Sequence, residues 1–292
     1  MLKSMTGFGR TEQSVGDKTF LVDIRSLNGK QFELQLKIPA ILKPYEFNIR
    51  NILSENLLRG TIDCLIMLKQ NGGTKPVSIN TELAKSYFKP LESLAKELNL
   101  DTAYTLSALL KLPEVITPST EVLTDEEWEG LQRIVLDAVL DLDRHRMTEG
   151  AVLENDLLQR VDQIRVQQDQ VIALEPLRKQ KTRDGLTKLL EDQVGPGNYD
   201  ANRLEQELIY YIEKMDISEE QVRLKNHCDY FRSIILEDGE TAKGKKLSFI
   251  LQEMGREINT TGSKAYDSTI QKCVVLMKDE LEKAKEQILN VL

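Results

Sequence analysis

Two short segments near the end of the chain contain the residue types that could carry chemistry. In the first, DISEEQVRLKNH at 216–227, Glu220, Arg223 and His227 are spaced i, i+3 and i+7. On a helix this spacing brings all three side chains to one face. A carboxylate and an imidazole could share a metal ion, or the imidazole could move a proton while the guanidinium holds a phosphate. A solvated face with a stabilising Glu–Arg pair is the alternative interpretation.

The second segment, GKKLSFILQEMGREINTTGSK at 244–264, combines carboxylates with cations. Glu253 and Glu257 are four residues apart, so on a helix their carboxylates lie one turn apart and could bracket a divalent ion. Arg256 lies beside them. Further cations and hydrogen-bonding groups are Lys245, Lys246, Asn259, Thr260, Ser263 and Lys264. The alternative is an ordinary amphipathic helix with the buried stripe Leu247, Ile250, Leu251, Met254 and Ile258.

The rest of the composition limits the available chemistry. The chain has two histidines and three scattered cysteines without a CxxC pair, which excludes a multi-histidine metal site and argues against a zinc knuckle. Carboxylates are therefore the main candidate ligands, and they suit Mg²⁺ or Mn²⁺. No P-loop, GxSxG or HExxH motif is present.

The overall charge allows RNA binding only through a local surface. The net charge is −8, which weighs against nucleic-acid binding unless basic groups converge on one face. The charge is uneven, with a net of +3 over residues 1–50 and −7 over residues 119–160. Aromatic residues make up 5%, so base stacking is not expected to dominate any RNA contact. Without a signal peptide or a membrane span, a cytoplasmic location is expected.

The elements that must position these residues change in kind along the chain. Period-two alternation predicts strands at 19–27, 31–38 and 61–69, a hairpin turn at Asn28-Gly29, and a short strand at 76–80. Helical spacing predicts helices over 45–58, ending at Gly60, and from Thr81 to about Asn99. The first 101 residues therefore form a mixed α/β domain.

From residue 102 onward the pattern is helical. Helices are predicted over 124–188, starting with a capped TDEEWEG turn, over 200–236, and over 244–290 with a break at Gly262. The predicted fold class is α+β, with an N-terminal domain at 1–101, a helical middle region at 102–198, and a C-terminal helical domain at 199–292 that carries the site. Long helices with narrow apolar stripes need partners, so a homo-oligomer is expected.

Five segments, in this order, resemble the YicC-like family of bacterial endoribonucleases. They are SMTGFGR at 4–10, RSLNGKQFE at 25–33, LLRGTIDC at 57–64, RMTEGAVLENDL at 146–157 and KKLSFILQEMGREINTTGSK at 245–264. The resemblance covers essentially the whole chain, and the last segment is the most specific. It implies RNA cleavage, stimulation by a divalent metal, and a ring-like homo-oligomer, a hexamer.

The residues and the resemblance together predict an endoribonuclease acting in RNA turnover. The catalytic and metal-binding residues, for Mn²⁺ or Mg²⁺, are Glu253, Glu257, Glu220 and His227. The RNA-binding residues are Arg25, Arg223, Lys245, Lys246, Arg256, Asn259, Ser263 and Lys264. Attack by the ribose 2′-hydroxyl, with His227 as base and no obligatory metal, is a second route. A non-catalytic protein that presents RNA to another nuclease is the alternative function, and a structural helical scaffold is a third.

Overall fold

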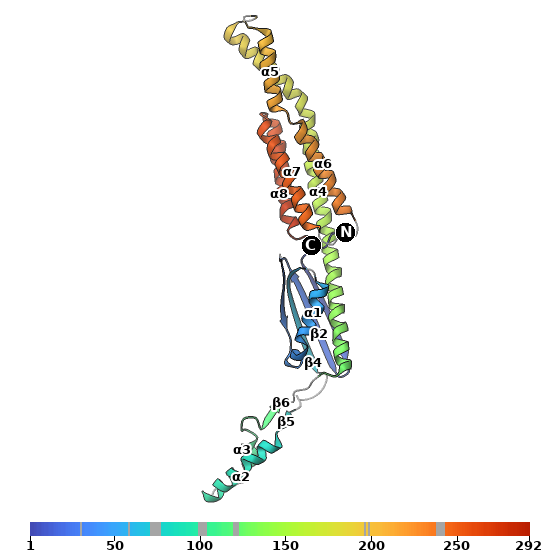
Figure 1. The fold of residues 1–292 in the computed structure, drawn as a ribbon, viewed down its shortest axis with the longest axis vertical. Helices are drawn as coiled ribbons and strands as arrows, with labels where there is room; N and C mark the ends of the chain where they lie inside the picture. Colours follow the sequence, from blue (N-terminus) through green and yellow to red (C-terminus); the bar gives the residue numbers. More distant parts are fainter. Residues whose placement is uncertain are drawn as a thin grey trace.

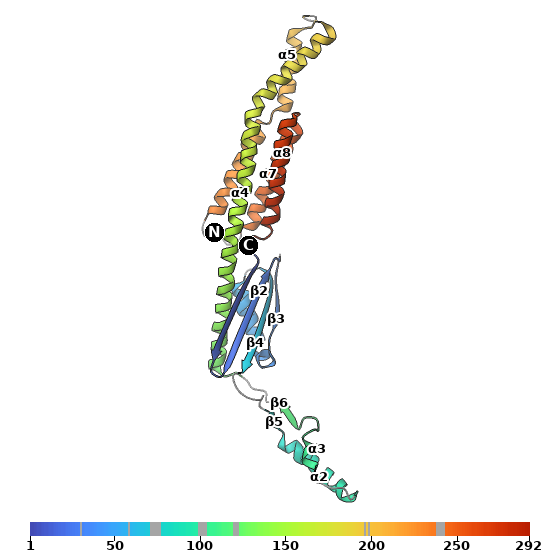
Figure 2. The same ribbon diagram turned by 180° about the vertical axis from the view of Figure 1, so that it is seen from behind.

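The chain is organised around one long helix, α4 (Asp125–Val194). In the computed structural model, α4 runs from one end of a β-sheet, through a bundle of helices, to the far tip of an elongated molecule (Figures 1 and 2). Both termini lie near the middle, where sheet and bundle meet (Figure 1). The structure describes residues 1–29, 31–57, 59–70, 77–98, 104–118, 123–195, 197, 199–237 and 243–292.

Four strands form the sheet in the order β1-β2-β4-β3. They are β1 (Gly7–Val15), β2 (Lys18–Leu27), β3 (Phe32–Lys37) and β4 (Gly60–Gln70). β2 is antiparallel to β1 and to β4, and β3 is parallel to β4. The predicted hairpin at Asn28-Gly29 is therefore wrong, because β4 separates β2 from β3. Alternation of apolar and polar residues identifies a strand but not the strand beside it. Asn28 does not form a hairpin turn; its side chain donates a hydrogen bond of 2.8 Å to the carbonyl oxygen of Leu289.

Strand β1 is not among the predicted elements, because its two glycines disfavour a strand. They are needed for its packing on α4. A Cβ atom on Gly9 would lie 2.2 Å from the carbonyl oxygen of Ala138, and one on Gly7 would lie 2.9 Å from the side chain of Leu142. The glycines of SMTGFGR therefore allow close strand–helix contact.

The two halves of α4 belong to two different hydrophobic cores. Its first half covers one face of the sheet with the buried residues Leu131, Ile134, Val135, Ala138 and Leu142. Its second half packs in the helical bundle through Leu157, Val161, Ile164 and Val171. The predicted capped start is confirmed: Thr124 accepts a hydrogen bond from the backbone N–H of Glu127, whose carboxylate accepts one from the N–H of Thr124. The predicted middle region thus contacts both the sheet and the bundle, and its boundaries at 102 and 198 stay a prediction.

The bundle contains α6 (Ser218–Leu236), α7 (Gly244–Lys264) and α8 (Ser268–Ile288), and α5 (Ala201–Met215) pairs with the end of α4 at the tip (Figure 1). The predicted helix over 200–236 is therefore two helices.

The last helical region is interrupted after Lys264 and not at Gly262. A Cβ atom on Gly262 would lie 3.0 Å from Val274, so this glycine permits close packing of α7 on α8. The chain turns at Tyr266, where φ is 40°, and Asp267 caps α8.

Short elements complete the chain. A 3-10 helix (Ala40–Tyr45) and α1 (Glu46–Asn56) lie beside the sheet, and β5 (Val77–Ile79), α2 (Thr81–Glu97), α3 (Thr105–Leu109) and β6 (Ile116–Pro118) form the tip opposite α5 (Figure 1). The predicted helices at 45–58 and 81–99 are confirmed, whereas Gly60 begins β4 and caps no helix. The α+β fold class is confirmed. Within the described ranges, none of the helices combines the length and apolarity that crossing a membrane requires.

Candidate active site at the α6–α7 seam

Helices α6 and α7 form an antiparallel pair joined by a short connection. The predicted stripe on α7, namely Leu247, Ile250, Leu251, Met254 and Ile258, is buried throughout. It packs against the buried α6 residues Leu224, Cys228, Phe231, Ile234 and Ile235. This apolar contact joins the two helices, and charged side chains lie along its edge.

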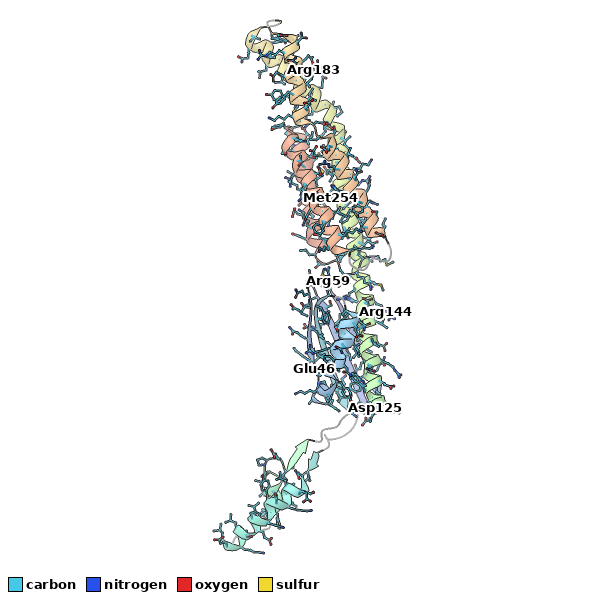
Figure 3. The ribbon with its side chains drawn as sticks, in the orientation of Figure 1. Glu46, Arg59, Asp125, Arg144, Arg183 and Met254 are labelled. Atoms are coloured by element: carbon cyan, nitrogen blue, oxygen red, sulfur yellow. The ribbon has the colours of Figure 1, made fainter. Side chains whose placement is uncertain are left out.

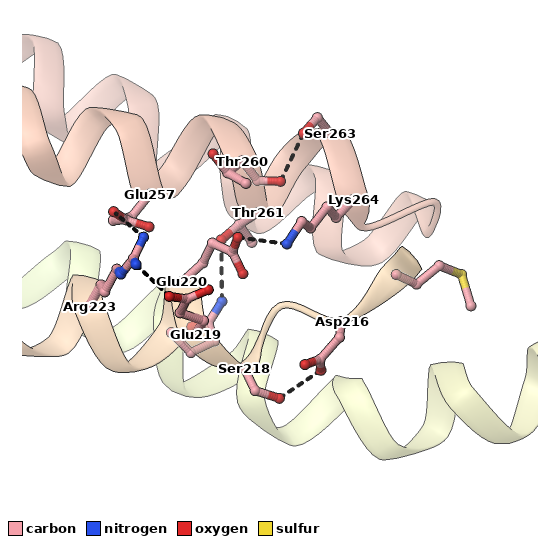
Figure 4. Close-up of polar contacts among 12 residues, drawn as sticks. Asp216, Ser218, Glu219, Glu220, Arg223, Glu257, Thr260, Thr261, Ser263 and Lys264 are labelled. Atoms are coloured by element: carbon pink, nitrogen blue, oxygen red, sulfur yellow. Dashed lines mark hydrogen bonds and ion pairs between the residues drawn. The ribbon is translucent and has the colours of Figure 1, made fainter. Parts of the chain in front are cut away.

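Three polar contacts cross the edge of this helix pair, which we call the α6–α7 seam (Figure 4). Near the start of α6, Lys264 donates a hydrogen bond of 2.8 Å to Glu220. One residue on, the side-chain amide of Gln221 lies 3.5 Å from the hydroxyl of Thr261. The guanidinium of Arg223 lies 4.0 Å from the carboxylate of Glu257 and also pairs with Glu219 on its own helix. The seam thus brings together four of the predicted site residues: Glu220, Arg223, Glu257 and Lys264.

The two seam carboxylates are buried while their cations reach solvent. The side chains of Glu220 and Glu257 are 7% and 10% exposed, whereas those of Lys264 and Arg223 are 35% and 55% exposed. Oε2 of Glu220 is buried and has no hydrogen-bond partner within the described residues. A buried carboxylate oxygen without a partner is unfavourable. The seam therefore holds acceptor capacity that the chain itself does not use.

The antiparallel register extends the seam by one more turn. Because Glu220 pairs with Lys264 and Arg223 with Glu257, His227 lies level with Glu253. Both are partly exposed. Glu253 forms an ion pair of 2.7 Å with Arg256, on the outer side of α7. Among the described residues, no group of three or more His, Cys, Asp or Glu side chains is placed to hold a metal ion.

Three predicted RNA-binding residues lie outside the seam. Arg25 is on the open face of the sheet, where its guanidinium lies 5.8 Å from the centre of the Phe8 ring. Lys246 is near the start of α7, 5.9 Å from the Tyr230 ring of α6. Lys245 is exposed and faces the sheet unit, by which we mean the four-stranded sheet with α1 and the first half of α4. Asn259 and Ser263 are exposed on α7 beside the seam.

Two residues that position the seam are not among the predicted ones. Arg178 of α4 is 4% exposed and donates hydrogen bonds to the carbonyl oxygens of Met215 (2.8 Å) and Ala265 (3.0 Å). It thereby fixes the end of α5 and the end of α7, where Lys264 lies. At the other end, the buried Lys243 donates to the carbonyl oxygens of Ile235 and Glu237 and holds the end of α6.

A sequence signal for Arg178 exists. The buried stripe of α4 continues from Val161 and Ile164 with alternating steps of three and four residues, through Gln168, Val171, Glu175 and Arg178. Polar residues therefore occupy positions that the spacing assigns to the core. Such residues must form hydrogen bonds with groups inside the protein. Here the side-chain amide of Gln168 donates a hydrogen bond of 2.6 Å to the carbonyl oxygen of Gln221.

A sheet unit and a helical bundle on one shared helix, with a charged seam in the bundle, define a two-part α+β protein. Each part matches a known family region: the endoribonuclease YicC-like N-terminal region matches residues 2–155, and the YicC-like C-terminal model matches residues 168–292. The protein named "Probable endoribonuclease YicC" of Clostridioides difficile is 32% identical over 300 residues, covering 100% of both chains. Its namesake of Haemophilus influenzae is 31% identical over 294 residues, also covering 100% of both. The chain belongs to the YicC-like family.

Proposed function

We propose that this protein is an endoribonuclease and that it cuts RNA at the α6–α7 seam. The observation that carries the proposal is the row of buried carboxylates and half-exposed cations along the seam, in a chain whose relatives are named probable endoribonucleases. Anchored cations bind phosphate, and carboxylates beside them serve proton transfer or metal binding. The proposed role is RNA turnover.

The cations would hold the RNA backbone. Arg223 and Lys264 are held at the seam by Glu257 and Glu220, so little side-chain freedom is lost when a phosphate arrives. Arg256 extends the positive surface along α7, and Asn259 and Ser263 offer hydrogen-bond donors to phosphate or ribose oxygens. Together these groups would fix the scissile phosphate against α7 and stabilise the charge that develops on it.

His227 is the group suited to proton transfer. An imidazole can both accept and donate a proton, and the partial exposure of His227 leaves it open to substrate. It would take the proton from the attacking oxygen, which is either water or the ribose 2′-hydroxyl. The two routes give RNA products with different ends, because attack by the 2′-hydroxyl produces a 2′,3′-cyclic phosphate. Analysis of the product ends therefore distinguishes the two routes.

A divalent cation, Mg²⁺ or Mn²⁺, is part of the proposal. Mg²⁺ commonly binds one or two carboxylates and completes its shell with water and substrate phosphate oxygens. The seam fits this pattern, since Oε2 of Glu220 is unpartnered and Glu257 contacts Arg223 only at 4.0 Å. Glu253, Glu257 and Glu220, with His227, would hold the ion. When bound, it would supply charge neutralisation at phosphorus and a more acidic water.

The proposal includes a homo-oligomer, a hexamer. Several large apolar side chains on α4 and α5 are more than half exposed, among them Leu177, Leu189, Ile209 and Tyr210. Apolar surface of this extent commonly marks a contact between proteins. Light scattering at micromolar concentration is expected to give a mass well above the 33.3 kDa of one chain. A mass of one chain would contradict this part of the proposal.

The test is cleavage of labelled RNA by the purified full-length protein, with Mn²⁺ and with EDTA. The parent is expected to cut with Mn²⁺, and Glu253→Gln is expected to lose most of this activity. Glu282→Gln is the matched control, because Glu282 on α8 is also exposed and also paired with a cation three residues away. Equal activity of Glu253→Gln and the parent would remove Glu253 from the site. RNA binding without any cutting by the parent would indicate a non-catalytic RNA-presenting protein.

A further inference from the structure

A recess lies where the sheet unit meets the helical bundle, and we call it the junction groove. Its walls come from Asn28 and Arg59 of the sheet unit, from Lys245, Phe249 and Gln252 of α7, and from Leu289 after α8. The cavity volume is about 690 Å³. Arg59 lies at the edge of the sheet that faces the bundle (Figure 3). The groove is therefore built by segments that are far apart in the sequence.

The walls of the junction groove are held by close backbone contacts. A Cβ atom on Gly244 would lie 2.4 Å from the carbonyl oxygen of Val291, so only glycine lets α7 begin this close to the C-terminal segment. Arg59 donates a hydrogen bond of 2.8 Å to the same carbonyl oxygen, and Asn28 donates one of 2.8 Å to that of Leu289. These contacts hold the groove in shape before any ligand arrives.

Two cationic side chains line the junction groove. Its lining contains Arg59 and Lys245 and no aspartate or glutamate among the described residues. Arg59 forms no ion pair with a carboxylate of the described chain, and its Nε atom is buried without a hydrogen-bond partner. Burial lowers the pKa of the Arg59 guanidinium, which still remains charged at neutral pH. An anion in the groove would supply a charged partner for the Arg59 guanidinium.

An aromatic ring lies next to these cations. The side chain of Phe249 is 57% exposed, one turn of α7 after Lys245. A ring open to solvent beside two cations is the arrangement that binds single-stranded nucleic acid, because the base stacks on the ring while the phosphate contacts the cations. Gln252 and Asn28 add amide groups that can hydrogen-bond a base or ribose.

The junction groove is continuous with the seam along the outer face of α7. Exposed residues recur at steps of three or four, and they are Lys245, Phe249, Gln252, Arg256, Asn259 and Ser263. None of them is acidic. From Lys245 to Glu253 the helix rises about 12 Å. A strand that keeps the 3.4 Å spacing of a stacked duplex strand covers this length in about three to four nucleotides.

We propose that the junction groove binds one nucleotide of single-stranded RNA, about three to four nucleotides from the bond that is cut. Arg59 and Lys245 hold its phosphate, and Phe249 stacks on its base. The inference rests on the proposed function, since the cut is placed at the seam. It adds a substrate-positioning subsite made jointly by the sheet unit and α7, and it requires RNA long enough to reach from groove to seam.

The test is binding of fluorescein-labelled oligouridylates of 4, 8 and 12 nucleotides to the full-length protein, without divalent metal. The parent is expected to bind the 8-mer at least ten-fold more tightly than the 4-mer. Phe249→Ala is expected to weaken 8-mer binding five-fold or more, the range for loss of one stacked base. Lys245→Gln is expected to reduce the slope of log K against log salt by about 0.7, the value for one phosphate on a single strand.

Matched controls separate the groove from general effects. Phe47→Ala on α1 removes another exposed phenylalanine, and Lys278→Gln on α8 removes another exposed lysine, so both should bind as the parent does. Arg59→Gln is informative only if its thermal midpoint is unchanged, because Arg59 also bonds to the backbone. Lys245 and Phe249 are exposed, so their variants test the subsite without that complication.

The possible outcomes bear on the subsite and on the proposed function separately. If Phe249→Ala and Lys245→Gln bind the 8-mer as the parent does while the parent still cuts RNA, the subsite is wrong and the endoribonuclease proposal stands. If both variants weaken binding but no protein cuts RNA, the groove binds RNA as proposed, whereas the nuclease proposal and the position of the subsite relative to a cut are wrong. If the variants change the oligomeric mass and leave RNA binding intact, the groove holds a second copy of the chain, which overturns the subsite.

Discussion

The sheet unit and the α6–α7 seam both contain a lysine–glutamate pair, but the two pairs differ in what surrounds them. Lys18 of β2 lies 2.6 Å from Glu127 of α4, and both side chains are about one-tenth exposed. Glu127 also completes the cap of α4, so its oxygens are used within the fold. At the seam, Lys264 lies 2.8 Å from Glu220, but the lysine is 35% exposed and one carboxylate oxygen has no partner.

We interpret the first pair as serving folding and, under the proposed function, the second pair as serving a ligand. The first is enclosed and satisfied, and it ties the start of α4 to the β1–β2 hairpin. In the second pair, the lysine is partly exposed to solvent, and one carboxylate oxygen of the glutamate has no hydrogen-bond partner. We therefore expect changes at Lys18–Glu127 to alter stability and changes at the seam to alter RNA cleavage.

The largest effect is expected for Arg223→Gln. Arg223 is the cation closest to Glu257, and the change removes both a phosphate contact and the partner of that carboxylate. Removing one preorganised charge-stabilising group commonly lowers the rate about 10²–10³-fold. The salt slope of RNA binding should fall by about 0.7, the value for one phosphate on a single strand. Arg133→Gln on α4, which removes an exposed arginine paired with Glu129, should change neither quantity; cutting by Arg223→Gln at the rate of this control would place the chemistry elsewhere.

Lys18→Met should instead reduce stability. It leaves Glu127 buried without its main partner, and breaking a buried pair costs about 3 kcal/mol of unfolding free energy. Burial alone would raise the pKa of Glu127, but the hydrogen bonds from Lys18 and Thr124 lower it below the ordinary value of 4.5. The stability from this pair is therefore present above pH 4.5 and lost as the pH falls through the lowered pKa of Glu127.

Urea unfolding at pH 7 and at pH 3 measures this effect. The difference between parent and Lys18→Met should be large at pH 7 and smaller at pH 3. Lys69→Met removes an exposed lysine paired with Glu12 in the same sheet, and it should change the unfolding free energy by less than about 1 kcal/mol. Equal losses for the two variants would show that the Lys18 pair is no more than a surface pair.

A smaller loss is expected at the turn between α7 and α8. Asp267 accepts hydrogen bonds from the backbone N–H groups of Thr269 and Ile270, and Asp267→Ala should cost about 1 kcal/mol. The bond from Ile270 is the main reason that the pKa of Asp267 lies below 3.8, so this stability is present above pH 3.8 and lost as the pH falls through the lowered pKa. Asp267→Asn keeps a side-chain oxygen that can accept these hydrogen bonds, so it should lose only a few tenths of a kcal/mol of unfolding free energy. A loss equal to that of Asp267→Ala would mean that the carboxylate charge matters more than the cap.

The smallest expected signal is thiol reactivity, and it reports on the two regions separately. Burial raises the pKa of Cys64 in β4 and of Cys228 in α6 to about 12 in each case. Compared with a thiol of pKa 9.0, the thiolate fraction is about 1,000-fold smaller, so both should react slowly with a thiol reagent until the protein unfolds. Rapid labelling of Cys228 alone in the native protein would show that α6 separates from the bundle while the sheet stays closed.

The sequence predicts the long helices and most strands, because burial on one face leaves a regular period. It does not predict strand partners. β4 enters between β2 and β3 by a crossover, and a local pattern carries no information on such distant pairing. The sequence also does not predict β1, because Gly7 and Gly9 disfavour a strand locally, whereas close packing on α4 requires them. Tertiary contact overrides propensity there.

The candidate site was predictable in part for the same reason. Helical spacing groups Glu220 with Arg223 and His227 on one helix, and Glu253 with Glu257 on the other. Which member of one helix faces which member of the other depends on the register of α6 against α7, and that register is fixed by Arg178 and Lys243 at the helix ends. Arg59 and Phe249 could not be linked from the sequence, because the groove between them exists only after the two units have packed.

The most direct test compares one variant from each region in the same assay. Single-turnover cleavage of one labelled RNA is measured with protein in excess for the parent, Glu257→Gln and Lys18→Met, and each rate is divided by the folded fraction at the assay temperature. Glu257→Gln should melt within a few degrees of the parent yet keep about 1% of its rate or less. Lys18→Met should melt at a clearly lower temperature and cut within two-fold of the parent rate per folded molecule. The reverse pattern, with Glu257→Gln unstable but fully active per folded molecule, would contradict the assignment of RNA cleavage to the α6–α7 seam.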